Sequence, residues 1–375
     1  MMTSRATGET ARLRKAEGLL AEGARGKTYT AAVLLAARGE EIACHAAAGE
    51  ARLSSVFDVA SLTKPLVACL FFALAQDGKI APEGNLSDLL PTLSPDPAAR
   101  GIRFLHLLSH TSGLPAYRPL YAAVRDADEK EGKRLWGTPE AKGRIADAAL
   151  SLPLEAAPGT ACVYSDPGYI LLGSALEIAA GEPLDRLLHG RIAGAIGMND
   201  TTYLPFAPLS ECETGRLVTT GYSEERRREK VGEVDDENAA AMGGVAGHAG
   251  IFSTAYDLFL FSREILRARR GEGRILTRPY ALRMTTVMED PPGCPRTPGW
   301  DTPTSTAGSV SQAGRHFSKG SFGHLGYTGC SLWIDPSREA VVVLLTNRIF
   351  FGKQNDGLKT LRPLLHDAVM EGLFP

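Results

Sequence analysis

The sequence predicts an α+β protein in which an antiparallel sheet, built from both ends of the chain, is flanked by helices. This prediction rests on the positions of the strand-like and helix-like patterns along the sequence. Alternating, β-branched or apolar runs occur at residues 28–38 and 42–50 and again at 329–347. Helical patterns broken by Pro/Gly loops dominate from Leu62 to about Leu204. Sheet elements at both ends and helices between them predict a terminal sheet with an inserted helical domain.

We therefore expect a sheet domain from residues 1–60 and 255–375, a mostly helical domain with long loops from 61–254, and an active site between the two. At 375 residues the chain is long enough for such a division. No internal repeat or low-complexity tract suggests another architecture.

The first part of the chain is predicted to form a helix and a hairpin, and residues 205–250 a loop. Residues 8–22 are rich in Ala, Leu, Glu, Arg and Lys, which favours an amphipathic first helix. The runs 28–38 and 42–50 flank the short turn "GEE" and predict a hairpin. Residues 205–250 turn polar and then glycine-rich, and we assign them to ordered loop.

Past this loop the pattern returns to helix and strand. "STAYDLFLFSREIL" predicts a helix capped by Ser253 or Thr254, with Asp257 in its first turn. "GCSLWIDP" and "EAVVVLLTN" predict a strand pair across "SR", and "GLKTLRPLLHDAVMEGL" predicts a closing helix.

The composition bears on which partners the protein binds and where in the cell it is found. Lys plus Arg number 41 against 43 acids, so a net charge of −2 gives no electrostatic reason to expect nucleic acid. The amino terminus has no apolar core of a secretory signal, and no run is long enough to span a membrane, so we expect the cytoplasm and no membrane span. The six cysteines never form a C-x-x-C pair, which argues against structural zinc and predicts free thiols.

The stretch "DVASLTKPLVACLFFALAQDGK" places Ser61 three residues before Lys64 at the start of an apolar helix. Residues three apart share a helical face, so the amine can reach the hydroxyl. Backbone N–H groups at a helix start also point toward incoming negative charge. One interpretation is a nucleophile with its base beside it, and the other is an N-cap serine with a surface lysine.

Two further pieces could complete a site. Tyr164 lies in "VYSDPGY", in a loop just before an apolar helix, where a nearby lysine ammonium would favour its phenolate. "SFGHLGYTGCSLWIDP" reads as a glycine-laden strand, and glycine in a strand marks a bulge or a close approach. If this strand edges a pocket, the Tyr327 and Ser61 N–H groups can serve as two donors to an oxyanion. Taken singly, Tyr164 could be a buried structural tyrosine and the strand a twisted core strand.

The order S-x-x-K, then Y-S-D, then H-x-G resembles the serine β-lactamase and penicillin-binding-protein superfamily. In particular it resembles the class C branch with its esterase and D-aminopeptidase relatives. "LLSHTSGLP", "GMNDTTYL" and "GGVAGHAGIFSTAYDL" are also similar to that family, so the resemblance covers about residues 50–350. It implies a β-lactamase/DD-peptidase-like fold.

The resemblance also implies residue roles. Ser61 would be the acylated nucleophile, Lys64 its neighbouring base or charge, and Tyr164 the general base and proton shuttle. Gly326 and Tyr327 would shape the oxyanion side of the pocket. No metal or cofactor is implied.

Two departures from the family pattern bear on substrate. His324 stands where penicillin-recognising members carry a lysine, and a neutral histidine would hold a β-lactam carboxylate less well. Asp166 stands in place of an asparagine, which removes an amide donor and adds a carboxylate that could instead pair with Lys64. Both changes lower the expectation of antibiotic hydrolysis.

Other motifs are weaker. His106 and His110 have the spacing of a zinc helix but lack the accompanying glutamate, so we expect a loop-packing role for His110. The glycines of "GGVAGHAG" are not a dinucleotide fingerprint. Asn347 follows a strand and could face the pocket, although asparagines at strand ends commonly terminate pairing.

The sequence thus predicts a serine hydrolase that cleaves a small-molecule ester or amide through an acyl-enzyme on Ser61, with esterase or D-amino-acid peptidase character. A true β-lactamase or penicillin-binding carboxypeptidase is the alternative reaction. A non-catalytic module that retains the pocket as a ligand sensor is the alternative from another class. The sequence makes no prediction about the oligomeric state.

Overall fold

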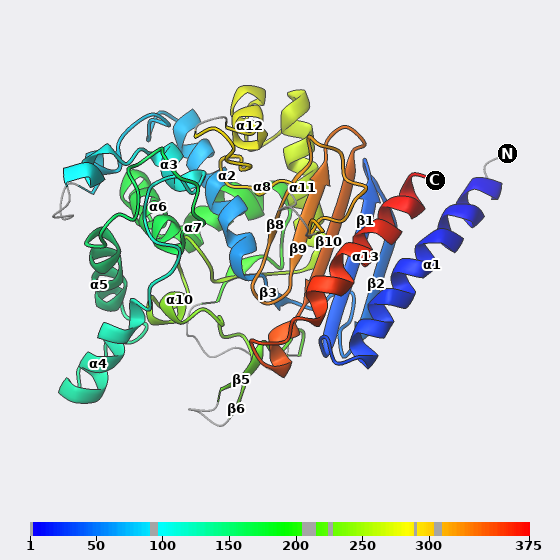
Figure 1. Cartoon of the computed structure of the whole chain (residues 1–375), viewed down its shortest axis with the longest axis horizontal. Helices are drawn as coiled ribbons and strands as arrows, with labels where there is room; N and C mark the ends of the chain where they lie inside the picture. Colours follow the sequence, from blue (N-terminus) through cyan, green and yellow to red (C-terminus); the bar gives the residue numbers. More distant parts are fainter. Residues whose placement is uncertain (1–2, 91–96, 205–214, 224–227, 289–290, 304–309) are drawn as a thin grey trace.

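The structure is a computed structural model of the chain, and it describes residues 3–90, 97–204, 215–223, 228–288, 291–303 and 310–375. Its centre is a five-stranded antiparallel sheet with the strand order β2-β1-β10-β9-β8 (Figure 1). The strands are β1 (Ala31–Arg38), β2 (Glu41–Gly49), β8 (Phe322–Leu325), β9 (Ser331–Asp335) and β10 (Ala340–Thr346). Both ends of the chain therefore build one sheet, as the sequence predicts.

The sheet is held in register by its middle strand pair. Strand β1 pairs with β10 along its length, with Val33 opposite Leu345 and Leu35 opposite Val343. Successive side chains of a strand point to opposite faces, so these two strands serve two cores at once. Val33 and Leu35 belong to the large core that continues into the helical part, whereas Leu34 and Leu344 pack against the terminal helices.

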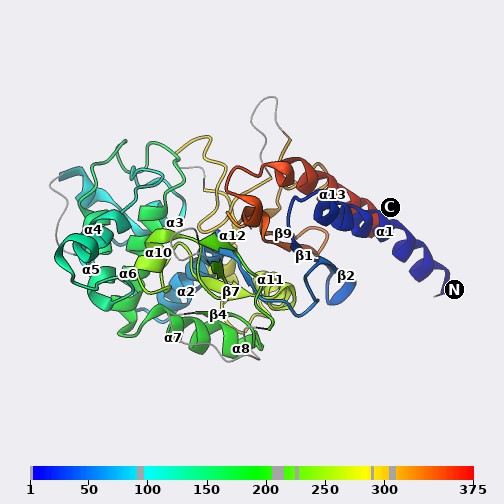
Figure 2. The ribbon, with the colours of Figure 1, turned by 90° about the horizontal axis from the view of Figure 1, so that it is seen from below.

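The first and last helices, α1 (Thr3–Arg25) and α13 (Gly357–Leu373), cover one face of this sheet side by side (Figures 1 and 2). Leu13 and Leu20 of α1 are buried there with Leu365 and Val369 of α13. The opposite face is covered by α11 (Ala255–Arg270), which contacts β1 and β10. The N-cap of α11 is Thr254, whose hydroxyl accepts the Asp257 N–H. Of the two caps predicted from the sequence, Ser253 and Thr254, the structure thus has the second.

The helical part lies on the side of the sheet away from the chain ends (Figure 2). Its main helix, α2 (Thr63–Gln76), is buried along almost its whole length because its sequence is apolar on every face. The other helices are α3 (Phe104–Leu108), α4 (Tyr121–Glu131), α5 (Pro139–Leu150), α6 (Asp166–Ala180), α7 (Leu184–Leu188), α8 (Gly194–Ile196), α10 (Glu237–Ala241) and α12 (Arg278–Thr285).

Two small sheets complete the fold. Strand β7 (Ile251–Ser253) pairs with β3 (Phe57–Asp58) and β4 (Thr202–Tyr203), and thus joins the segment before Ser61 to the segment after the glycine-rich loop. Strands β5 (Gly221–Ser223) and β6 (Arg228–Lys230) form a hairpin. The division into domains at residues 60 and 255 remains a prediction.

Two assignments from the sequence were wrong in part. Residues 205–250 are not loop throughout, because they contain β5, β6 and α10; the parts at 205–214 and 224–227 lie outside the described residues. The predicted strand through His324 to Gly326 ends at Leu325, and a turn separates it from β9. Gly329 in that turn has φ = 104°, a conformation that requires glycine and that ends a strand.

Among the helices that the structure describes, none is both long and apolar enough to cross a bilayer. The cytoplasmic location remains a prediction. Cys44, Cys69, Cys162, Cys294 and Cys330 are free, and Cys212 lies outside the described residues.

Candidate active site

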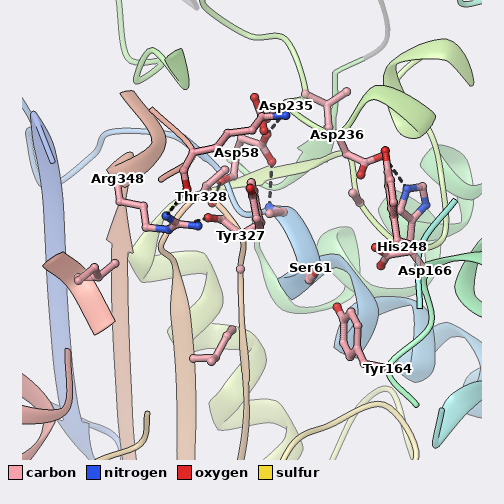
Figure 3. Close-up of a pocket in the computed structure, with 18 of the residues that line it drawn as sticks. Asp58, Ser61, Tyr164, Asp166, Asp235, Asp236, His248, Tyr327, Thr328 and Arg348 are labelled. Atoms are coloured by element: carbon pink, nitrogen blue, oxygen red, sulfur yellow. Dashed lines mark hydrogen bonds and ion pairs between the residues drawn. The ribbon is translucent and has the colours of Figure 1, made fainter. Parts of the chain in front are cut away.

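A pocket of about 660 Å³ opens between the start of α2, the start of α6, the segment before α10 and the turn between β8 and β9 (Figure 3). Its lining contains Ser61, Tyr164, Asp166, Gly326 and Tyr327. The other lining residues are Asp58, Ala60, Tyr117, Val234, Asp235, Asp236, Glu237, His248, Ala249, Gln312, Leu325, Thr328, Arg348, Lys353, Leu358, Lys359 and Arg362.

Ser61 is presented by a tight turn and does not cap a helix. It lies in a 3₁₀ turn, Ala60–Leu62, between β3 and α2, and the N-cap of α2 is Leu62 without a side-chain hydrogen bond. The preceding Ala60 has φ = 48°, which is unusual for a residue with a side chain. The Asp58 carboxylate holds this turn by accepting the Ala60 N–H at 2.9 Å. Such local strain is common where a fold must present a functional side chain.

Lys64 is completely buried beside Ser61, which excludes the alternative of a surface lysine. Its ammonium donates to the Ser61 hydroxyl oxygen at 3.0 Å and to the His248 carbonyl oxygen at 3.0 Å. It also forms an ion pair with the Asp166 carboxylate at 2.8 Å. Burial by itself lowers the pKa of Lys64, but the charge of Asp166 and interactions with the neighbouring polar side chains outweigh burial, and the net pKa is raised. Lys64 is therefore an ammonium in the resting protein.

Tyr164 lines the pocket next to Ser61 (Figure 3). The Lys64 ammonium and the Arg296 guanidinium lie 4.8 Å and 5.2 Å from its ring centroid. Lys64 lowers the pKa of Tyr164, as expected from the sequence. Burial acts more strongly in the opposite direction, so the net pKa is raised and the resting side chain is a neutral phenol.

The turn between β8 and β9 brings Tyr327 to the pocket. Gly326 lies so close to the Ser61 segment that a Cβ at this position would be 2.6 Å from the Val59 carbonyl oxygen. The Thr328 hydroxyl donates to the Asp58 carbonyl oxygen at 2.9 Å, which ties the turn to the strand before Ser61. The N–H groups of Ser61 and Tyr327 donate no backbone hydrogen bond in the part of the chain that the structure describes.

Two residues expected at the pocket do not line it. His324 is buried below the pocket wall, where its ring lies 6.0 Å from the Tyr164 ring and Nδ1 contacts the Leu325 carbonyl oxygen. Burial, helped by Lys64 and Arg296, lowers the pKa of His324 far below its usual value, so it carries no charge near neutrality. Asn347 is also buried outside the lining, because its amide binds Thr30, Ala31 and Thr219 at the end of β10. Of the two alternatives for Asn347, these bonds favour the structural role at the end of a strand.

The two histidines of "HLLSH" and the segment "GGVAGHAG" make structural contacts. Nδ1 of His110 accepts the Ser165 N–H at 3.0 Å, which fixes the residue next to Tyr164, and His106 contacts the Arg103 side chain. Among the described residues, no group of three or more His, Cys, Asp or Glu side chains is arranged to hold a metal. The segment "GGVAGHAG" contributes His248, whose Nε2 contacts the Asp236 carboxylate at 2.7 Å. Burial acts to raise the pKa of Asp236, but His248 and other partners hold it at about 2.

The sequence did not point to several pocket residues. Asp58, Asp236 and Arg348 lie in the lining, yet no motif in the sequence indicated them. Asp58 stands inside the same stretch as Ser61, and the proximity of an acid to a candidate nucleophile was the only available signal. Arg348 is held by its bond to the Tyr327 carbonyl oxygen, a contact between two separate turns that no local pattern encodes.

The beta-lactamase family model matches residues 16–364. This chain belongs to the beta-lactamase family and is a hydrolase of that family.

Two curated relatives are similar over most of this chain. An Escherichia coli K12 protein named "Putative D-alanyl-D-alanine carboxypeptidase" is 29% identical over 323 residues, which are 80% of this chain and 70% of that protein. A Bacillus subtilis protein named N-acetylmuramyl-L-alanine amidase is 30% identical over 324 residues, 78% of this chain and 68% of that protein. Among solved structures, EstCE1, described as a hydrolase with promiscuous acyltransferase activity, has a TM-score of 0.68 at 23% identity and matches 96% of this chain and 99% of its own. The structural likeness supports the beta-lactamase/penicillin-binding-protein fold.

Proposed function

We propose that the protein hydrolyses small esters or amides through a covalent acyl-enzyme on Ser61. The observation that carries this proposal is the buried Lys64 ammonium, which lies 3.0 Å from the Ser61 hydroxyl oxygen and 4.8 Å from the Tyr164 ring centroid. A weak hydroxyl becomes a useful nucleophile when neighbouring groups can remove its proton.

The protonation states define the first step. Tyr164 and Lys64 both hold their protons at rest, and Asp166 is the carboxylate within reach of Lys64. In the proposed relay the Ser61 proton moves to the Tyr164 oxygen, the Tyr164 proton to Lys64, and a Lys64 proton to Asp166. Ser61 then attacks the substrate carbonyl carbon, and the proton returns along the same path to the leaving group. Asp166 thus acts as proton acceptor, in addition to its predicted place in the substrate pocket.

The negative charge on the carbonyl oxygen needs donors. We assign the N–H groups of Ser61 and Tyr327 to this oxyanion, since both residues line the pocket and neither N–H has a backbone acceptor in the described structure. Gly326 allows the close approach of the two segments. Water then attacks the acyl-enzyme by the same relay, and the acid is released.

The names of the two relatives indicate a narrower class of substrate. Their names refer to peptide-type amides, one next to D-alanine and one next to a muramyl group. We propose esterase or D-amino-acid peptidase character over β-lactam hydrolysis, because His324 is neutral and carries no fixed charge for a β-lactam carboxylate.

The test is turnover of chromogenic esters, D-amino-acid amides and a cephalosporin by four proteins: wild type, Ser61→Ala, Tyr164→Phe and Asp166→Asn. We expect Ser61→Ala to abolish turnover, and the other two variants to lower kcat by roughly a hundredfold or more, since each interrupts the relay. Circular dichroism and thermal melts check that each variant is folded. Ester turnover by Ser61→Ala at the wild-type rate contradicts the proposal. Stable acylation of the wild type without turnover supports a ligand sensor instead.

A further inference from the structure

Two cysteines that are far apart in the sequence, Cys162 and Cys294, approach the same backbone oxygen. The Sγ atom of each lies 3.9 Å from the Ser109 carbonyl oxygen. Both are free thiols; Cys162 is partly exposed, and Cys294 has 4% of its surface exposed. The fold therefore gathers two sulfur atoms around one oxygen, and a molecule as small as hydrogen peroxide can approach them from the Cys162 side.

The two thiols change each other's acidity. The neighbouring Cys162 side chain lowers the pKa of Cys294, an effect that burial opposes and Arg296 supports. The pKa of Cys162 is raised in turn, first by Cys294 and then by burial. Such a pair releases its first proton more readily than an isolated thiol and holds the second more tightly. Since the thiolate is the reactive form of cysteine, this pair has one sulfur prepared to react.

The other described cysteines show the opposite behaviour. Burial raises the pKa of Cys44 to about 12 and that of Cys330 to about 11, and it also raises the pKa of Cys69. Thiols of this kind stay protonated and unreactive near neutral pH. Among the cysteines that the structure describes, reactivity is therefore concentrated in the pair Cys162 and Cys294.

Each cysteine of the pair lies two residues before a side chain that surrounds the proposed proton relay. Cys162 precedes Tyr164, and Cys294 precedes Arg296, whose guanidinium lies 5.2 Å from the Tyr164 ring centroid. The ring of His110, which follows the shared carbonyl in the chain, lies 4.4 Å from the Tyr164 ring. A movement of either sulfur would thus be passed to the surroundings of Tyr164.

We propose that Cys162 and Cys294 form a reversible disulfide when the protein meets a peroxide, and that this bond slows turnover by displacing Tyr164. Two bonded sulfur atoms are about 2.0 Å apart, which is much closer than two thiols in contact. Closing that gap must pull the two segments toward each other. The disulfide itself does not depend on the proposed reaction, whereas its effect on turnover rests on the proposed function.

The oxidation needs only hydrogen peroxide as a co-reactant. The Cys294 thiolate attacks one peroxide oxygen; an S–O bond forms, the O–O bond breaks, and the departing hydroxide takes a proton to become water. The Cys162 sulfur then attacks the Cys294 sulfur, the S–S bond forms, and the S–O bond breaks. The second hydroxide leaves as water with the Cys162 proton. Two thiols and one peroxide thus give one disulfide and two waters, and a dithiol reductant reverses the change.

The first measurement is peptide mass spectrometry without reduction, after peroxide treatment and alkylation of the remaining thiols. We expect the wild type to give one linked peptide pair that contains Cys162 and Cys294 and has lost two hydrogen atoms, and we expect dithiothreitol to separate it. Cys44→Ser is the matched control and should give the same pair, because Cys44 is a buried free thiol beside Glu17. Linkage of either cysteine to Cys212, or further oxidation of both without linkage, overturns the proposal.

The second measurement compares kcat/KM for an ester before and after peroxide. We expect a fall of roughly tenfold or more in wild type and in Cys44→Ser, with recovery in dithiothreitol. Cys162→Ser and Cys294→Ser should each keep, after peroxide, the rate that they have before it. Circular dichroism checks that all variants are folded. An equal fall in all four proteins would show oxidation elsewhere in the chain and contradict the proposal.

A crystal structure of the oxidised protein separates the disulfide from the reaction. A Cys162–Cys294 bond with a displaced Tyr164 ring, in a protein that hydrolyses no ester in either state, would uphold the thiol pair and refute the proposed reaction. Ester hydrolysis that the bond leaves unchanged, with the Tyr164 ring in its present place, would do the reverse.

Discussion

At the scale of single residues, the site depends on a lysine that has no exposed surface. A buried ammonium is tolerated only when its charge is paired and its protons are bonded. Asp166 supplies the charge, and Ser61 and the His248 carbonyl accept hydrogen bonds. The partners that stabilise Lys64 are thus the groups that the proposed chemistry uses, which explains how this residue can be both buried and functional.

Asp58 is a second buried charge-bearing residue, and its pKa leads to a prediction. Burial raises the pKa of Asp58 from 3.8 to about 7, although the Ala60 and Asp235 N–H groups oppose that shift. Because the folded state holds this proton more tightly than the unfolded chain, its contribution to stability falls as pH rises from about 4 to about 7. The expected loss between pH 5 and pH 8 is about 2–3 kcal/mol.

The predicted pH dependence of stability can be checked by urea unfolding of wild type and Asp58→Asn at several pH values. The variant also loses an acceptor for one N–H, so we expect it to be less stable at low pH but to have a flatter dependence on pH. Comparing slopes cancels the contribution of the other titrating groups. Parallel curves for the two proteins would show that Asp58 does not titrate in this range.

The sequence predicted the residues of the site only where they form a pattern. Ser61 and Lys64 are three residues apart at the start of one apolar run, and Tyr164 and Asp166 are two residues apart just before another, so spacing indicated them. The pocket positions of Asp58 and Arg348 result from contacts between separate segments, such as the Arg348 bond to Tyr327 and the Asp58 bond to Thr328. Asn347 shows the opposite case, since it follows a strand as expected but its amide oxygen accepts the N–H groups of Thr30 and Ala31 at the start of β1.

At the scale of elements, the pocket forms where the 3₁₀ turn of Ser61 meets the turn between β8 and β9. In the second turn, Thr328 bonds to Asp58 in β3, just before the first turn. The Tyr327 and Gly329 carbonyl oxygens accept hydrogen bonds from Arg348 and Arg362. The Tyr327 N–H is therefore positioned by contacts with three separate parts of the chain. A small shift of this turn should affect the reaction more than the stability of the fold.

Gly326→Ala tests that expectation. The new Cβ would lie 2.6 Å from the Val59 carbonyl oxygen, so one of the two segments must move. We expect kcat/KM for esters to fall by about a hundredfold, as for the loss of an oxyanion donor. The free energy of unfolding should fall by only about 1–3 kcal/mol.

Gly320→Ala is the matched control, because a Cβ there meets nothing within 4 Å. It should leave both activity and melting temperature close to those of the wild type. If Gly326→Ala retained activity within threefold of the control, the close approach of these turns would have no role in the reaction.

Element types were predictable where the sequence period is clear. The closing helix was predicted over the residues 357–373 that α13 occupies, and the β1–β2 and β9–β10 pairs were found from apolar runs bounded by turns. The segment 205–250 lacks a period because it is polar and then rich in Gly and Ala, so the short α10 and the β5–β6 hairpin gave no signal. Short elements of this kind are stabilised by tertiary contacts rather than by their own propensity.

At the scale of the whole molecule, the two ends of the chain form one sheet and one pair of packed helices, and the middle of the chain supplies the other side of the pocket (Figure 1). The alternation of Leu34 and Leu35 toward two different cores explains why β1 reads as a continuous apolar run. The overall plan was predictable because strand patterns occur only near the ends. The relative placement of Ser61, Tyr164 and Tyr327 in space came from the family resemblance, since no local rule brings these three segments together.

The most direct test of Ser61 as the nucleophile is mass spectrometry of the intact protein and its peptides after reaction with a fluorophosphonate. We expect a single adduct on the peptide that contains Ser61, and none on Ser61→Ala. An adduct on any other residue, or an unmodified Ser61 in a protein that turns over esters, would contradict the proposed mechanism.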